Sequence, residues 1–563
     1  MVNDVNESVM RSQADTVPGG LTFDAPGPGA WELDATHRGR RPLTPFVRNI
    51  LVVESQAGFR VLVERYGLPL EGIQAELVHG CLYLRPVGLG EGSTPKPPPP
   101  KWIMKMVARL HPGMRRCNRI AAQAWSERRW RHEVDRWFDH ERADVVAKNL
   151  ELQRIDVAAL DDAHLLNQVA ALLDHFSSQA RLNLETHGGD LIPVGDFLAH
   201  CRRWGIPDAA STALLQGSSP ATIETAELLA PVARAIAEAS DQPRSVDAIR
   251  ALGPSVAAAV DTWLELHSWR LITSDDIDKP TLAERPTLQL AALLAATDEH
   301  AAMRPPPDPT SVRSDVTADQ RGLFDTLLAE ARYGMRQRDD NVGVRWNWSG
   351  GLLRRALLEA GRRLVEAGRL ERVGHVVELT PEELGPLLVS GTGPSAGDIA
   401  KRARQRDLVE AAHAPDLLGD PEPPPPIDAL PAPMARATAA LMAVLEAEGL
   451  SREQTPGQLT GTGIGNTTYR GVARVATSRD DALDRLEPGD VLVAPFTGPS
   501  YNSILPLLGA LVVDVGGPMC HAAIAAREFS LPAVIGATGA TTSIPDGAVV
   551  EIDPVLGRVL IVD

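Results

Sequence analysis

The spacing of apolar and polar positions divides the chain into two regions. From residue 101 to about residue 388, apolar side chains recur at helical spacing, and the segments 168–192 and 222–239 are amphipathic. Towards the C-terminus, short apolar runs such as 490–496 alternate with turn residues such as 487–489. This pattern predicts a multidomain protein, with a mainly α-helical domain followed by a C-terminal β/α domain. Further strands are predicted at 471–477, 510–515, 532–537, 548–552 and 558–562.

Proline-rich and polar stretches indicate where the domains end. Residues 419–433 (GDPEPPPPIDALPAP) have no apolar periodicity, and a helix rich in Ala and Leu is predicted at 435–448. Residues 91–100 form a second proline-rich stretch, either a spacer or a stiff surface loop. The predicted organisation is a disordered tail (1–20), a mainly helical domain with an N-terminal extended or strand segment (21–420), a linker with a connecting helix (421–455) and the β/α domain (456–563).

Two local signals predict where helices begin. Thr317, with Gln320 three residues later, has the spacing of a capping box at the start of a helix over 320–337. Thr380 directly before Pro381 is typical of an N-cap followed by the first helical residue.

Composition and charge narrow the class of protein. The 563 residues carry a formal net charge of −17, which disfavours nucleic acid or an anionic membrane as the partner. No run of 18 apolar residues predicts a transmembrane helix, and the polar N-terminus does not resemble a secretory signal. The four cysteines are scattered without a C-x-x-C pair, so neither a metal site nor a disulfide framework is predicted. These features together predict a cytoplasmic protein.

The candidate chemistry lies in residues 513–536, VDVGGPMCHAAIAAREFSLPAVIG. A predicted strand passes through Gly516 and Gly517, which allow a sharp turn, and His521 then stands at the first turn of a predicted helix over 522–529. Unpaired N–H groups and the helix dipole favour a negative group there, and a neutral imidazole is a good nucleophile. The pattern suits a histidine that accepts and releases a phosphoryl group. The alternative is a capping or surface histidine, the commoner role of a single His at a helix start.

The whole string GG-x-x-C-H-A-A-I-x-A-R-E-x-x-x-P-A-V-x-G resembles the phosphohistidine swivelling domain of the PEP-utilising enzymes. This family includes pyruvate phosphate dikinase, PEP synthase and rifampicin phosphotransferase. The resemblance implies that His521 carries the phosphoryl group, with Cys520 beside it and Gly516 and Gly517 in the phosphate-binding loop. Arg527 is the candidate that contacts the phosphohistidine.

A second pattern of the family, PGDVLV-x-x-x-T-x-P, appears at residues 488–499. The acidic residue that usually stands between the Thr and the Pro is absent, because the sequence reads Thr497-Gly498-Pro499. Any role of that acid in phosphoryl transfer is therefore in doubt for this chain.

The helical region resembles the substrate domain of rifampicin phosphotransferase-like enzymes more loosely. The match at 29–46 includes His37, and the match at 264–286 includes Arg270, preceded by Trp269 where the family has His. His37 and His267 are candidates for the general base, and Arg270 for substrate binding. The ten tryptophans, all before residue 419, either line a substrate pocket or form the core.

A third match, ARYGMRQRDDN at 331–341, contains Arg332 and Arg336 four residues apart, on one face of a predicted helix. Two guanidinium groups on one face could hold a phosphoryl or carboxylate oxygen. The alternative is a solvated helix face on which the arginines pair with Asp339 and Asp340.

No segment resembles an ATP-grasp domain, and there is no G-x-x-x-x-G-K-[ST] loop. The resemblance therefore implies that ATP and Mg²⁺ are bound by a separate ATP-grasp protein that charges His521. We expect a phosphotransferase subunit that passes the phosphoryl group to a hydroxyl of a small organic substrate in the helical domain. Two alternatives stay open: a phosphohistidine-bearing regulatory or scaffold protein without turnover, and an enzyme that uses PEP directly.

Overall fold

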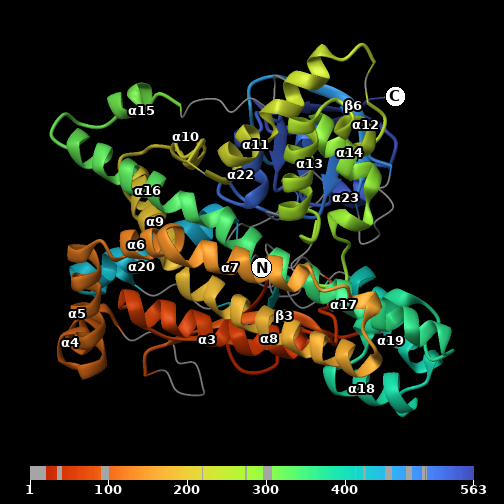
Figure 1. The fold of residues 1–563 in the computed structure, drawn as a ribbon. Helices are drawn as coiled ribbons and strands as arrows, with labels where there is room; N and C mark the ends of the chain where they lie inside the picture. The colour runs from red at the N-terminus through yellow and green to blue at the C-terminus, as the bar shows by residue number, and fades with distance from the viewer. Residues whose placement is uncertain are drawn as a thin grey trace, which may run out of the picture.

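The computed structural model describes most of the chain as a helical body and a sheet-containing C-terminal region (Figure 1). The described residues are 21–34, 41–90, 100–218, 220–241, 243–272, 276–295, 307–412, 414–421, 426–449, 459–476, 485–497, 501 and 504–562. The predicted tail, residues 91–99 and His37 lie outside them. The predicted fold class, mainly helical with a C-terminal β/α domain, is confirmed. None of the helices in the described ranges has the length and apolar character needed to cross a bilayer.

Long helices form the centre of the helical body. α8 (Asp162–Thr186) packs against α3 (Arg48–Tyr66) and against α17 (Trp348–Glu366). α16 (Arg321–Asn341) continues through a π-helical turn, Val342–Asn347, directly into α17. A buried cluster of leucine, valine and aromatic side chains from α8, α17 and the surrounding segments forms the core.

The two predicted helix starts differ in outcome. α18 (Pro381–Ser390) begins after the N-cap Thr380, as predicted. The structure adds a capping box, in which the Glu383 carboxylate accepts the Thr380 N–H at 2.9 Å. The capping box predicted at Thr317 is wrong, because Gln320 is itself the N-cap of α16 and makes no side-chain capping bond. The Gln320 N–H donates instead to the Thr317 carbonyl at 2.9 Å, so a backbone turn replaces the side-chain bond.

A small antiparallel sheet joins the two ends of the helical body. Its strand order is β2-β3-β1-β4. The strands are β1 (Trp31–Leu33), β2 (Leu70–Val78), β3 (Cys81–Gly88) and β4 (Leu417–Leu418). The β2–β3 hairpin turns at His79 and Gly80, whose φ angles of 51° and 87° are the positive values that a tight hairpin needs. Trp31 pairs with Leu418, so the chain returns to its starting point before it enters the C-terminal region.

The C-terminal region is built on a seven-stranded mixed sheet in the order β11-β10-β6-β7-β8-β9-β5. The strands are β5 (Thr462–Ile464), β6 (Tyr469–Val475), β7 (Val491–Ala494), β8 (Ala510–Val513), β9 (Ala533–Ile535), β10 (Val549–Asp553) and β11 (Arg558–Val562). β6 to β9 run parallel, and β7, β8 and β9 are buried along their whole length. The sheet curls, because Thr460, just before β5, bridges to Arg558 on the opposite edge strand.

Helices from the middle of the chain cover this sheet. α11 (Pro220–Glu238), α13 (Pro254–His267) and α14 (Pro286–Ala295) lie over the C-terminal sheet in Figure 1. Val260 of α13 and Leu511 of β8 belong to one buried apolar cluster. The two regions therefore share an apolar core.

The predicted connecting helix is part of the helical body. α20 (Ala432–Glu448) packs along α9 (Gly188–Arg203) so closely that a Cβ on Gly195 would lie 1.9 Å from the Ala440 carbonyl oxygen. The Arg436 guanidinium donates to both Asp196 oxygens, at 2.6 and 2.8 Å. These contacts fix the first half of α20 against α9.

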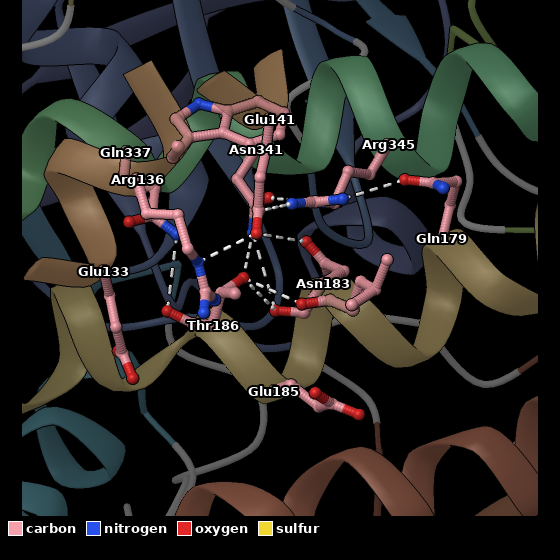
Figure 2. A network of polar contacts seen from close by, with 12 residues as sticks. Glu133, Arg136, Glu141, Gln179, Asn183, Glu185, Thr186, Gln337, Asn341 and Arg345 are labelled. Carbon is pink, nitrogen blue, oxygen red and sulfur yellow. Dashed lines mark hydrogen bonds and ion pairs between the residues drawn. The ribbon is translucent and has the colours of Figure 1, made fainter. Parts of the chain in front are cut away.

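A buried polar network holds the π-helical turns in place (Figure 2). Arg345, 1% exposed, donates to Asn341 Oδ1 at 2.7 Å, to Gln179 Oε1 at 2.9 Å and to Glu141. Asn341 in turn donates to Asn183 Oδ1 of α8 at 3.0 Å. Glu141 ends a π-helical turn at Trp137–Glu141, and Arg345 lies in the turn at Val342–Asn347. Both irregular segments are thus tied to each other and to α8. Removing one partner of such a buried pair costs about 3–5 kcal/mol.

Candidate functional site

The loop before His521 has the strand, glycine turn and helix that the sequence predicts. β8 ends at Val513, and α22 spans His521–Glu528, with Cys520 as its N-cap. Gly516 has a φ of 137°, and a Cβ there would lie 2.6 Å from Cys520 Sγ. Only glycine fits this turn without strain, because the backbone conformation and the space both exclude a side chain.

The same loop is docked on the last turn of α20. The Met519 N–H donates to the Ala447 carbonyl oxygen at 2.8 Å. A Cβ on Gly517 would lie 2.3 Å from that oxygen, so the two backbones touch. Met519 and Ile524 also enter an apolar cluster with Met335 of α16. His521 is therefore positioned against the helical body by backbone contacts on one side and by apolar contacts on the other.

His521 is half-buried at the first position of α22. Its Nδ1 is 3.0 Å from Thr497 Oγ1, which follows β7. Burial, and next the positive charge of Arg338, lower the pKa of His521 to about 3. The imidazole is therefore neutral at physiological pH, as nucleophilic attack by a ring nitrogen requires.

Arg338, on α16 of the helical body, supplies a positive charge near His521. Its guanidinium donates to Glu448, the last residue of α20, and lies 3.4 Å from Asp190. Burial opposes its charge, but Glu448 and Asp190 outweigh burial and raise the pKa of Arg338 above its usual value. A permanent positive charge thus stands near His521, on the body and not on the C-terminal region.

Arg527 is 8% exposed and lies one and a half turns after His521 on α22. Its Nη1 donates to the Pro518 carbonyl at 2.6 Å, which ties the helix to the loop. Its Nη2 is buried and has no hydrogen-bond acceptor within the described residues. Burial lowers the pKa of Arg527 to about 10, which leaves the side chain charged at neutral pH. A buried guanidinium nitrogen without an acceptor is suited to an anionic oxygen.

Cys520 fits a structural role beside these residues. Burial raises the pKa of its thiol to about 11, so the thiol stays protonated at neutral pH and is not a nucleophile. Across the described part of the chain, no group of three or more His, Cys, Asp or Glu side chains is arranged to hold a metal ion.

Residues 486–557 match the family model described as the mobile domain of PEP-utilising enzymes. This chain carries a PEP-utilising enzyme mobile domain. The match contains β7, β8, β9 and α22, and therefore Thr497, His521 and Arg527. The expected resemblance of this region is confirmed.

Relatives of this chain align over stretches of very different length. Rifampicin phosphotransferase of Bacillus subtilis (strain 168) is 42% identical over 97 residues, 17% of this chain and 11% of the relative. Phosphoenolpyruvate synthase of Deinococcus radiodurans is 40% identical over 87 residues, 16% of this chain and 11% of that protein. An uncharacterised protein of Mycobacterium tuberculosis (strain ATCC 25618 / H37Rv) aligns over 419 residues at 27% identity. That alignment spans 72% of this chain but only 43% of the relative's length.

In the region before the mobile domain, His267 and Arg270 lie among aromatic side chains. His267 stacks on Trp263 with ring centroids 5.4 Å apart, and burial lowers its pKa well below the usual value. Arg270 lies over the Trp348 ring at 5.2 Å and donates to the Leu266 carbonyl at 2.9 Å. Trp263 and Trp348 are buried, so here the tryptophans form core.

Arg332 and Arg336 share a face of α16, but each already has contacts within the body. Arg332 donates to the carbonyls of Leu214 at 2.8 Å and Pro307 at 3.2 Å. Arg336 lies over the rings of Phe138 at 4.8 Å and Tyr333 at 5.2 Å. The alternative prediction was that these arginines pair with Asp340, but Asp340 has other partners.

The Asp340 carboxylate accepts from Arg142 at 2.8 Å and from Trp137 at 2.9 Å. Two residues beyond Arg336, in the same sequence motif, Arg338 is the arginine that acts on His521. Sequence reasoning missed Arg338 and Thr497, although both lie within motifs that resemble the family, because their proximity to His521 depends on how the regions pack.

Proposed function

We propose that this chain is the phosphoryl-carrying component of an ATP-dependent, dikinase-type phosphotransferase. A separate ATP-grasp protein binds ATP with Mg²⁺ and presents the β-phosphorus to His521. The imidazole nitrogen attacks that phosphorus, the bond to the α-phosphate oxygen breaks and AMP leaves. Water takes the γ-phosphoryl group as inorganic phosphate. In the second step a hydroxyl of a small organic acceptor takes the phosphoryl group from His521, its proton is released, and a phosphate ester forms.

The contact between His521 and Thr497 carries this proposal. We assign to His521 the tautomer in which Nδ1–H donates to Thr497 Oγ1, 3.0 Å away, and in which the lone pair lies on Nε2. The lowered pKa of His521 keeps the ring neutral at neutral pH. Nε2 is therefore the nucleophilic atom and the one that carries the phosphoryl group.

The surroundings suit a charged intermediate. Arg527 supplies a buried, charged nitrogen without an acceptor among the described residues, and the first turn of α22 supplies N–H groups. Arg338 adds positive charge from the helical body. Catalysis of the transfer would then consist mainly of positioning and of charge stabilisation.

The helical body is the proposed site of the acceptor. The mobile domain is docked on this body in the structure, through Gly517 against α20 and through apolar contacts with α16. A rifampicin phosphotransferase is among the relatives of this chain, which supports an organic hydroxyl as the acceptor group. Charging by a separate ATP-grasp protein requires the mobile domain to leave this position, so we propose that it swings between two sites.

The experiment that tests the donor step uses ATP labelled at one phosphorus at a time. The full chain is incubated with Mg²⁺, an extract of its native cells and either [β-³²P]ATP or [γ-³²P]ATP. Acid-labile label on the chain from the β-labelled nucleotide only, with none on His521→Ala, is the predicted result. Label from the γ-position, or equal labelling of His521→Ala, contradicts the proposal. His164→Ala, an exposed histidine of α8, is the matched control and keeps full labelling.

A further inference from the structure

A basic cavity lies on the helical body, between the helices that follow the first proline-rich stretch and the start of α20. Its volume is about 770 Å³. α4 (Lys101–Leu110) and α5 (Pro112–Glu127) form one side, and the segment from Asp428 to Ala432 forms the other. All the lining residues that the structure describes belong to the helical body.

Four cationic side chains line this cavity, two from each helix. Lys105 and Arg109 are four residues apart on α4, and Arg115 and Arg119 are four residues apart on α5. Within the part of the chain that is described, none of the four makes a hydrogen bond or an ion pair through its side chain. The carboxylate that lines the cavity, Asp428, is 2.8 Å from Lys101, which does not line it.

This arrangement is unfavourable without a counter-ion. Like charges four residues apart on a helix destabilise it by about 0.2–0.5 kcal/mol per pair, and both helices carry such a pair. The whole chain has a net charge of −17, so four clustered cations are not needed for solubility. Several other guanidinium groups of the helical body are paired with carboxylates, as Arg402 is with Glu383 and Arg363 is with Glu359. The four cations at the cavity are therefore available to bind an anionic ligand.

We infer that this cavity binds a ligand with two or more linked phosphate groups. Each pair of cations can take one phosphate, and arginine binds phosphate oxygens with two parallel N–H donors. Leu430, Pro431 and Ala432 give the cavity an apolar wall, against which an uncharged part of the ligand can pack. The site stands apart from His521 and does not depend on the phosphoryl-transfer proposal.

The phosphate groups can come from a free oligophosphate, a nucleotide or a lipid head group. The residues exposed beside the cavity indicate that a lipid source of the phosphate groups should be tested. α4 also exposes Trp102 and Leu110, each 68% accessible, and Met106, 48% accessible, at positions four residues apart. Exposed aromatic and aliphatic side chains beside cations are typical of helices that lie on anionic membranes, so vesicles form one arm of the test.

The test is calorimetric titration of the full chain at low salt. The probes are inorganic tripolyphosphate, Mg²⁺-free ATP, and phosphatidylcholine vesicles with and without phosphatidylinositol 4,5-bisphosphate. We expect saturable binding of at least one phosphate probe, weakened at least tenfold in the double variant Arg115→Glu, Arg119→Glu. Asp428→Asn, which removes the cavity's carboxylate, should bind the same probe more tightly. If the ligand is a nucleotide, ATP should bind more tightly than tripolyphosphate. If it is a lipid head group, the vesicles should bind, and Trp102→Ala should abolish that binding.

The matched control is Arg116→Glu, because Arg116 is exposed on α5 but does not line the cavity. It should change the affinity less than twofold. If Arg116→Glu weakened binding as much as the double variant does, the binding would be general charge attraction and the proposed site would be wrong. Absence of saturable binding of every probe at millimolar concentration would overturn it as well. All substituted residues but Trp102 are surface charges, and thermal unfolding of each variant checks that the fold is intact.

Discussion

Replacing Gly517 with alanine should disturb the docking of the His521 loop on α20. A Cβ at this position would lie 2.3 Å from the Ala447 carbonyl oxygen and 2.9 Å from the Gly449 nitrogen. The first distance is about 1 Å shorter than an ordinary contact, and both neighbours are backbone atoms that cannot rotate away. The loop or the end of α20 must therefore move.

The cost has two parts. Forcing a methyl group into a filled space costs about 1–3 kcal/mol. The hydrogen bond from Met519 N–H to Ala447, 2.8 Å long in the structure, would be broken or lengthened, which adds about 1 kcal/mol. The docked loop should thus lose about 2–4 kcal/mol, and hydrogen exchange of the Met519 amide should accelerate by about 30- to 1000-fold.

Hydrogen-exchange mass spectrometry of the Met519 peptide measures this effect directly, and thermal unfolding reports any wider loss of stability. Gly374→Ala is the control, because a Cβ there meets no atom within 4 Å. It should leave exchange at Met519 unchanged. If Gly517→Ala exchanged at the wild-type rate, the contact between the loop and α20 would not exist in solution.

Three further predictions concern the histidine itself. Because the folded state holds the pKa of His521 at about 3, below the usual value near 6.5, the unfolded chain binds more protons between these values, and stability falls as the pH drops from 6.5 towards 3. This contribution to the free energy of unfolding is at most about 1.4 kcal/mol per pH unit, reduced by solvent at the half-buried ring. Urea unfolding of His521→Gln should lack this pH dependence. If both proteins lost stability equally as the pH fell, the lowered pKa of His521 would be wrong. Thr497→Val frees the tautomer and should slow phosphorylation of His521 about tenfold, read from initial labelling rates, whereas an unchanged rate would remove Thr497 from the site. Arg527→Met should shorten the lifetime of the phosphorylated chain about 10- to 100-fold, followed by loss of label, and an unchanged lifetime would show that Arg527 only ties α22 to Pro518.

Local chemistry made part of the site predictable from sequence. The strand, the Gly516–Gly517 turn and the helix that starts at His521 are short-range features, and each is dictated by residues within a few positions of it. Thr380 and Glu383 form their capping box for the same reason. Local patterns do not always decide the structure. Thr317 and Gln320 have the spacing of a capping box, but the N-cap of α16 is Gln320.

Contacts between distant segments could not be predicted in this way. Arg338 affects His521 because α16, α20 and α22 meet in one apolar cluster, which no local pattern encodes. Arg332 and Arg336 have the predicted spacing, yet tertiary packing turns them towards backbone carbonyls and aromatic rings. Whether a helix face is solvated or occupied depends on the neighbours that the fold supplies.

Mass spectrometry of the chain isolated from its native cells shows whether His521 carries a phosphoryl group. The chain is isolated and digested at alkaline pH, because a phosphoryl group on imidazole is lost in acid. We expect one added phosphoryl group on the peptide that contains His521, localised to that residue and removed by brief acid treatment. Phosphate only on a hydroxyl-bearing residue, or the same acid-labile phosphate on the His521→Ala chain, would contradict it.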